Sequence, residues 1–378
     1  MAIIMLPASD IPVSSLSQLR FAMQSFTFAT IVSFFTLISL ATSTATPQDQ
    51  KANLPLPSHL VHQFPGPITY VENIRARQNG QLLVTFVAPS PSVYLIDPLV
   101  SPIAPTSNQT ATLVHNFPSV GLLGITEVQP DQFYVAAGNF SVATMDLGAG
   151  TWSIWSLDLR AYDAISNSGA VVQEAASLPK AGFLNGIDTF NVEENLIVAA
   201  DSVNGQIWLV DVESGDSKVL VTDPLLAPPR GSTGLGINGL KVLRRGDTVY
   251  LYFSTQATAL FGRLPVSVSG DHIVGPVEIL ANGTVMDDFV LDEERGVAFM
   301  SGAATNTLLS IPLDGGELTT LLGGLNETVL AGPTSATLGR GLLDRDAVYV
   351  TTNGGVLAPV NGTFTEGGKI VSVDIGYC

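Results

Sequence analysis

The chain has 378 residues, of which 46% are hydrophobic and only 13% charged, and its formal net charge is −17. An acidic chain without a basic stripe cannot neutralise phosphates, so we expect neither nucleic acid nor an anionic membrane surface as a partner. The single cysteine, Cys378, excludes an intrachain disulfide framework and a zinc site built from thiolates. The 36 glycines and 23 prolines are typical of a turn-rich β protein.

Residues 1–46 predict a secretory signal segment. No charged side chain occurs from Phe21 to Thr46, and an apolar run over 26–40 is followed by small residues. This pattern favours a cleaved signal peptide, with Met23 as the true start and 1–22 as an extension. The run also approaches the roughly 20 residues that span a bilayer, so an uncleaved signal anchor is the alternative. That anchor is the only membrane association we expect.

Sequons for N-glycosylation follow the signal segment. In a secreted protein they predict glycan-bearing surface loops at Asn108, Asn139, Asn282, Asn326 and Asn361. We therefore expect the protein to enter the secretory pathway or to be secreted. Residues 47–58 are polar and proline-rich, which predicts a linker ahead of one domain over 59–378.

Beyond His59 the chain consists of short apolar or alternating runs separated by Gly, Asn, Asp and Pro, with no amphipathic helix. A unit of three such runs opens near residues 72, 124, 185, 238, 287 and 335, at intervals of 48 to 61 residues. With a weaker fourth run, such as 218–221, this predicts an all-β fold: a six-bladed β-propeller of four-stranded blades around a central channel. Residues 59–64 are expected to close the ring. A pair of β-sandwiches is the alternative, but it does not explain why the same three-strand pattern occurs six times.

Polar residues open the first strand of several units. If these strands line the channel, their opening residues converge at one mouth, and the candidates are Glu72, Asn185, Asn238 and Asp287. Two carboxylates and two amide oxygens form a hard oxygen shell suited to Ca²⁺ or Mg²⁺. The alternative is that the Asn-Gly pairs are tight turns and the acidic residues ordinary loop chemistry.

The openers Glu72, Asn185-Gly186-Ile187 and Asn238-Gly239-Leu240, with the run 287–292, resemble the gluconolactonase/senescence-marker/luciferin-regenerating superfamily. The resemblance covers roughly residues 60–375. It implies a six-bladed propeller and, for the enzymes, a central divalent metal. Asp287-Asp288 stands where that superfamily usually has Asp-Gly, so either carboxylate is a candidate ligand.

The chain is also similar to a narrower group, fungal propellers found beside secondary-metabolite genes. The segments that carry this similarity are 72–75, 183–188, 287–292 and 352–355. Some of these propellers are hetero-Diels–Alderases that join a tropolone-type o-quinone methide to a humulene-type sesquiterpene. The resemblance implies hydrophobic small-molecule substrates and a reaction that requires no cofactor. A metal-dependent lactonase or esterase is the first alternative, and a non-catalytic small-molecule-binding propeller is the second.

A cycloaddition needs two apolar partners held in register, donors aimed at the carbonyl, and a dry site. For the donors we expect Asn185, Asn238 and Arg340 as catalytic residues, with an ion pair as the alternative for Arg340. The residues expected to bind substrate are Tyr70, Phe183, Phe190, Phe253, Gln256 and Phe261. Packing between blades is the alternative for the aromatic ones. A Ser-His-Asp triad is not expected, because no histidine occupies an opening position.

Overall fold

The computed structural model describes residues 53–99 and 111–376. All of them belong to one compact unit, Gln50–Cys378. The predicted signal segment, the first half of the predicted linker, Asn108 and Cys378 lie outside the described residues. Within them the regular structure is entirely strand, and no helix is long and apolar enough to cross a membrane.

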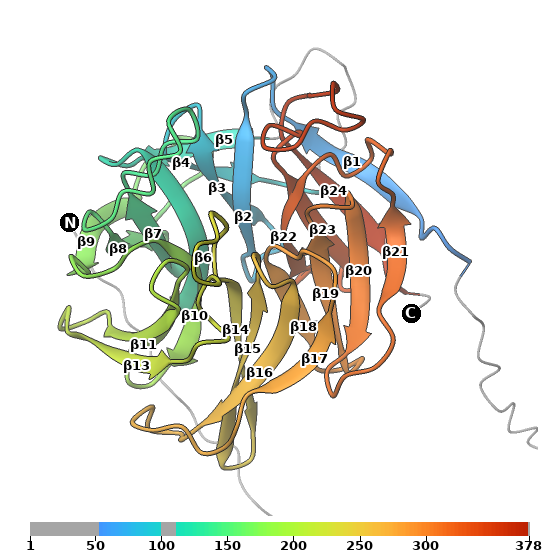
Figure 1. The fold of residues 1–378 in the computed structure, drawn as a ribbon. Helices are drawn as coiled ribbons and strands as arrows, with labels where there is room; N and C mark the ends of the chain where they lie inside the picture. The colour runs from blue at the N-terminus through green and yellow to red at the C-terminus, as the bar shows by residue number, and fades with distance from the viewer. Residues whose placement is uncertain (1–52, 100–110, 377–378) are drawn as a thin grey trace, which may run out of the picture. The chain divides into compact units, whose positions relative to one another are not determined.

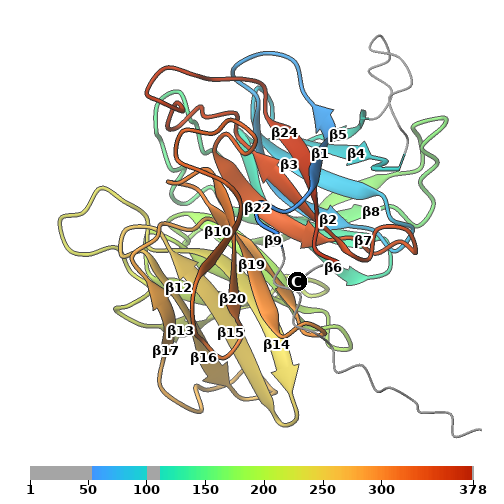
Figure 2. The same cartoon turned by 90° about the vertical axis from the view of Figure 1, so that its right-hand side faces the viewer.

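The described strands form six antiparallel four-stranded sheets, which follow one another in chain order around a ring (Figures 1 and 2). Blade 1 contains β2 (Tyr70–Ala76), β3 (Leu82–Ala88), β4 (Ser92–Ile96) and β5 (Ala111–Asn116). Blade 2 contains β6 (Gly121–Gln129), β7 (Gln132–Gly138), β8 (Ser153–Asp158) and β9 (Val171–Ser177). Blade 3 contains β10 (Leu184–Asn191), β11 (Leu196–Asp201), β12 (Gln206–Asp211) and β13 (Ser217–Thr222).

The second half repeats the arrangement and confirms the predicted six-bladed β-propeller. Blade 4 contains β14 (Ile237–Arg245), β15 (Thr248–Thr255), β16 (Leu260–Val266) and β17 (Glu278–Asn282). Blade 5 contains β18 (Phe289–Asp292), β19 (Val297–Gly302), β20 (Thr307–Pro312) and β21 (Thr319–Gly323). Blade 6 contains β22 (Pro333–Leu338), β23 (Ala347–Thr352), β24 (Lys369–Asp374) and, from the start of the domain, β1 (Ser58–Gln63).

Blade 6 joins the two ends of the domain. β1 pairs antiparallel with β24, with Leu60 opposite Val371 (Figure 2). The closing strand predicted from residues 59–64 is thereby confirmed, although it begins one residue earlier, at Ser58. β1 is the outer strand of this sheet, and its pairing with β24 ties the start of the domain to its end.

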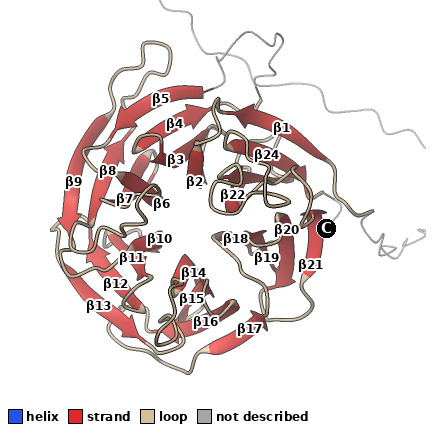
Figure 3. Ribbon diagram, turned by 45° about the horizontal axis from the view of Figure 1, so that its top comes forward, coloured by secondary structure: helices blue, strands red, loops and turns tan. Residues whose placement is uncertain are grey.

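The first strand of each blade faces the centre of the ring (Figure 3). Five of these strands carry a register shift near their start, and the residues set outside the ladder include Glu72, Leu123, Asn185, Asn238 and Thr334. A β-bulge of this kind inserts an extra residue and re-aims its side chain. Glu72, Asn185 and Asn238 are therefore turned toward the axis by a recurring bulge, whereas Asp287 lies just before β18.

The Asn-Gly pairs are not tight turns. Gly186 and Gly239 lie within β10 and β14, and neither has a positive φ. A Cβ on Gly186 would come within 2.7 Å of the carbonyl oxygen of Asn238 in the next blade. A Cβ on Gly239 would come within 2.6 Å of Asp288 Oδ1. Glycine is required because the inner strands of neighbouring blades approach closely at this level.

Three aromatic residues expected to bind substrate lie in the core between blades instead. Phe190 and Phe253 are at most 1% exposed and belong to one cluster between blades 3 and 4. Phe261 is fully buried against Phe289 of blade 5, with ring centroids 5.1 Å apart. Their role is packing, since the side chains on each face of a blade's sheet contact the neighbouring blade.

Candidate functional site

A cavity of about 230 Å³ opens where the inner strands begin, and we call it the mouth cavity. All four predicted oxygen ligands line this cavity. Glu72, Asn185, Asn238 and Asp287 come from blades 1, 3, 4 and 5, and none is more than 5% exposed. We call these four residues the mouth ring.

Several oxygens of the mouth ring are buried without a partner in the described structure. They are Glu72 Oε2, Asn185 Oδ1 and Asn238 Oδ1. A buried acceptor left unpaired costs about 1–3 kcal/mol, so three of them converging from three blades point to a ligand that accepts their lone pairs. Among the described residues no three His, Cys, Asp or Glu side chains are grouped so that they could hold a metal ion, so the amides would have to complete the set. The donors fit a hard divalent cation such as Ca²⁺ or Mg²⁺.

The two carboxyl groups of the mouth ring are held where ionisation is unfavourable. Burial raises the pKa of Glu72 well above its usual range, and the nearby Asp287 charge raises it further, against a hydrogen bond from Tyr70 that lowers it. Burial also raises the pKa of Asp287 to about 8, with the charge of Asp288 as the second cause. A cation between the two groups would reverse both shifts, because positive charge favours the ionised form.

The structure decides between the two neighbouring aspartates. Asp287 lines the mouth cavity, whereas Asp288 is engaged elsewhere. Lys241 Nζ lies 2.6 and 2.7 Å from the two oxygens of Asp288, and Asn73 Nδ2 donates to it at 2.9 Å. The candidate ligand is therefore Asp287.

The wall above the mouth ring is apolar. Phe183 packs edge-on against Phe140 and Trp152, with centroids 5.0 and 5.1 Å apart. Met145 and Leu357 stand at the rim, 58% and 47% exposed. The remaining apolar residues of the wall are Leu123, Leu147 and Leu235.

Sequence reasoning missed most of this wall. Phe140, Met145, Leu147, Leu235 and Leu357 lie in loops between strands, where no periodicity marks a residue as facing a cavity. For Leu123 a signal existed, because Leu123-Gly124 occupies the place in blade 2 that Asn185-Gly186 occupies in blade 3. The predicted opener in blade 2 was one residue off.

The other predicted site residues divide into two groups. Tyr70, Phe183 and Gln256 line the mouth cavity. Arg340 does not, since it lines a separate cavity of about 370 Å³ at the far ends of the inner strands. It donates to the Ala76 carbonyl oxygen at 3.0 Å and pairs with Glu127 of blade 2. Arg340 lies beyond the end of β22, and at about 3.3 Å per residue that strand carries it away from the mouth.

No family model matches the chain. The chain matches two curated proteins over 333 residues, and both are provisionally named hetero-Diels–Alderases. The Phoma sp. protein is 28% identical, over 79% of this chain and 88% of its own length. The Sarocladium schorii protein is 26% identical, over 80% of each chain. The chain resembles these hetero-Diels–Alderases.

The fold has a wider resemblance. A solved luciferin-regenerating enzyme superposes with a TM-score of 0.59 at 14% identity, over 84% of this chain and 95% of that one. At this identity the match shows the propeller fold alone. The resemblance to the hetero-Diels–Alderases, by contrast, rests on sequence across most of the described propeller.

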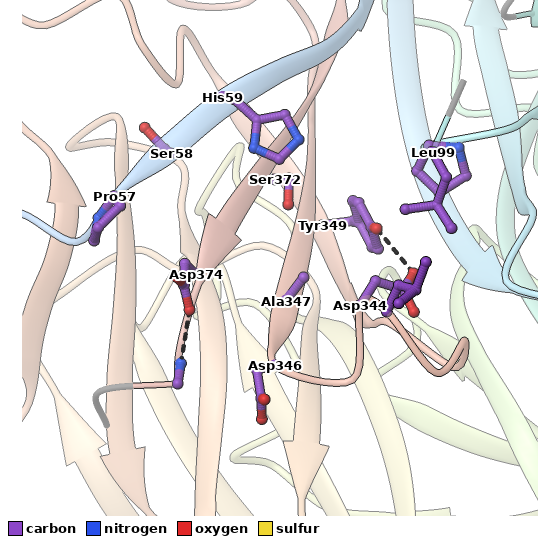
Figure 4. Close-up of a pocket in the computed structure, with 13 residues that line it drawn as sticks. Pro57, Ser58, His59, Leu99, Asp344, Asp346, Ala347, Tyr349, Ser372 and Asp374 are labelled. Carbon is purple, nitrogen blue, oxygen red and sulfur yellow. Dashed lines mark hydrogen bonds between the residues drawn. The ribbon is translucent and has the colours of Figure 1, made fainter. Parts of the chain in front are cut away.

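A larger cavity, of about 600 Å³, lies beside β1 and β24 and is lined by three aspartates (Figure 4). Their side chains already have partners. Asp344 accepts from the Tyr349 hydroxyl at 2.9 Å, and Asp374 accepts from the Gly376 N–H at 2.9 Å. Asp346 pairs with Arg295. This cavity therefore offers no unpaired groups comparable with those of the mouth ring.

The four described sequon residues are exposed, as glycosylation requires: Asn139, Asn282, Asn326 and Asn361. Glycosylation, the signal segment and secretion stay predictions.

Proposed function

We propose that the protein is an enzyme, a hetero-Diels–Alderase that acts in secondary-metabolite biosynthesis. Its substrates would be a tropolone-type o-quinone methide and a humulene-type sesquiterpene, joined in the mouth cavity. The proposal is supported by similarity to two provisionally named hetero-Diels–Alderases over about four fifths of the chain. The amphiphilic mouth cavity is the structural observation that carries it.

The reaction places modest demands on the protein. The heterodiene C=C–C=O adds across the alkene, so that one C–C and one C–O bond form while three π bonds become one. No proton, electron or leaving group has to be moved. The protein contributes by holding two apolar partners in register, which converts a bimolecular step into an effectively unimolecular one.

The mouth cavity has the parts for this task. Its apolar wall, which includes Phe183 and Leu123, excludes water that would otherwise add to the quinone methide. Its polar lining offers donors from the Asn185 and Gln256 amides, whereas the Tyr70 hydroxyl already donates to Glu72. A donor aimed at the carbonyl oxygen stabilises the charge that develops there in the transition state. The oxygenated partner is therefore placed at the floor and the hydrocarbon along the wall.

A divalent cation, Ca²⁺ or Mg²⁺, would be held by the mouth ring. When bound, such an ion supplies Lewis-acid polarisation of a carbonyl oxygen. The cycloaddition itself requires no cofactor. The unpaired oxygens of Glu72, Asn185 and Asn238 are the observation that favours the second candidate function, a metal-dependent lactonase or esterase.

One set of assays separates these functions. We expect the purified protein, supplied with an o-quinone methide precursor and a humulene-type alkene, to accelerate formation of a single stereoisomer of the adduct, before and after exhaustive chelation. Only background, stereorandom adduct would contradict the proposal. Lactone hydrolysis that is lost on chelation would establish the lactonase instead, and a ligand-induced rise in Tm without turnover would indicate a binding propeller.

A further inference from the structure

A group of buried polar side chains lies on the channel axis next to the mouth ring, and we call it the axial cluster. Its members come from four different blades: Asn73, Lys241, Asp288 and Ser335. Ser335 Oγ lies 3.3 Å from Asp288 Oδ2 and 3.2 Å from Asn73 Oδ1. All four residues are at most 9% exposed. The cycloaddition proposed above makes no use of them.

Asp288 is the centre of the axial cluster and the link to the mouth ring. It follows Asp287 directly, as Asn73 follows Glu72, so two members of the axial cluster are chain neighbours of two members of the mouth ring. Lys241 Nζ contacts both oxygens of Asp288 and also donates to the Leu240 carbonyl oxygen at 3.2 Å. The lysine charge therefore offsets a third negative charge at the floor of the cavity, which leaves two carboxyl groups on the ring.

The ion pair is not explained by stability. Removing two charges from water is costly, and an apolar pair of similar volume is often as stable or more so. Lys241 is 9% exposed and Asp288 2%. Nζ also lies 5.4 Å from the centroid of the Phe289 ring, so the lysine charge makes a cation–π contact as well. Unlike an apolar pair, these two charges act electrostatically on the neighbouring mouth ring.

We propose that Lys241 and Asp288 act as a charge lock: Lys241 neutralises Asp288, so that only Glu72 and Asp287 offer carboxyl groups to a divalent cation in the mouth ring. Lys241 and Asp288 are positioning residues in this account, because they act through Glu72 and Asp287. The inference rests on the cation proposed for the mouth ring and not on the cycloaddition.

The test is a set of charge variants titrated with Ca²⁺ by calorimetry and with Tb³⁺ by luminescence sensitised by tyrosine. Lys241→Met leaves Asp288 uncompensated, and the Ca²⁺ affinity is expected to rise by about tenfold, with a larger rise for Tb³⁺. Asp288→Asn leaves Lys241 uncompensated, and the affinity is expected to fall by about tenfold. The double variant restores neutrality and returns to within about threefold of the wild type.

Opposite signs for the two single variants are what a purely structural role cannot produce. If both single variants weaken binding and the double variant does not recover, the axial cluster only supports the backbone and the charge lock is overturned. Absence of Ca²⁺ and Tb³⁺ binding to the wild-type protein would overturn it as well, while the cycloadduct assay still judges the proposed function separately. The control is Lys369→Met, which removes a similarly buried lysine. Lys369 Nζ lies 2.6 Å from a carboxylate oxygen of Glu366, and neither residue lines the mouth cavity. This variant is expected to leave both affinities unchanged.

Discussion

At the scale of single residues, Leu357 offers the sharpest test of the apolar rim. It lines the mouth cavity while 47% exposed, so its replacement by a charged residue should not disturb the core. Losing its contact with a hydrocarbon substrate removes about 1.5–3 kcal/mol at most, which corresponds to a fall in kcat/KM of about 10-fold to 100-fold. We expect Leu357→Asp to show this loss mainly as a higher KM for the alkene, in steady-state kinetics of adduct formation.

The matched control for this substitution is Leu343→Asp. Leu343 is 84% exposed and lines the larger, aspartate-lined cavity instead. Its kcat/KM should equal that of the wild type, and the Tm of both variants should be unchanged. Equal kinetics for the two variants would remove the rim from the substrate site.

Residue identity could be predicted from sequence here, but residue orientation could not. The sequence shows two adjacent carboxylates, Asp287 and Asp288, and leaves either as a candidate ligand. Which one faces the cavity depends on Lys241, located 47 residues earlier, whose Nζ lies 2.6 Å from Asp288. A contact so distant along the chain leaves no local pattern in the sequence. The same holds for Arg340, which was grouped with the mouth residues although it lies near Glu127 at the opposite end.

At the scale of elements, the inner strands depend on glycine at the bulge. A Cβ on Gly186 would meet backbone atoms of Asn238 and Leu240 at 2.7 Å, and backbone cannot rotate out of the way. We expect Gly186→Ala to lower the free energy of unfolding by about 1–3 kcal/mol, as overpacking does. Urea denaturation followed by circular dichroism measures this change.

Gly324→Ala is the corresponding control. The nearest atom to its added Cβ is Glu327 Oε1 at 3.3 Å, at the end of a flexible side chain, and Gly324 has no positive φ. Its free energy of unfolding should stay within about 0.5 kcal/mol of the wild type. A Gly186→Ala protein as stable as this control would show that the inner strands can separate at no cost.

The strands were predictable from sequence because each repeats the same alternation, whereas the loops that complete the site were not. The Asn-Gly pairs marked the inner strands correctly, but for a reason other than turn formation, since Gly186 and Gly239 are needed for close approach between blades. The apolar rim depends on Met145, Leu235 and Leu357, whose loops differ in length and sequence from blade to blade. Repetition therefore predicts the scaffold, and the variable loops carry the part of the site that repetition cannot reveal.

At the scale of the whole molecule, the pairing of β1 with β24 closes the ring at blade 6. Val61 of β1 is 7% exposed and packs in one cluster with residues of blades 1 and 6, such as Phe86 and Ile370. A charge placed there without a partner should cost on the order of 3 kcal/mol. We expect Val61→Asp to detach β1 and to open the ring.

The three tryptophans report whether such an opening is felt across the propeller. Trp152, Trp155 and Trp208 lie in blades 2 and 3, away from blade 6. If ring closure couples the blades into one cooperative unit, Val61→Asp lowers the urea midpoint seen by tryptophan fluorescence, in a single transition that coincides with circular dichroism. Leu60→Asp, at the neighbouring position that is 52% exposed, should leave the midpoint nearly unchanged. An unaltered tryptophan midpoint in Val61→Asp, together with a separate early loss of circular dichroism, would mean that blade 6 unfolds alone and that the mouth ring of blades 1, 3, 4 and 5 is held without closure.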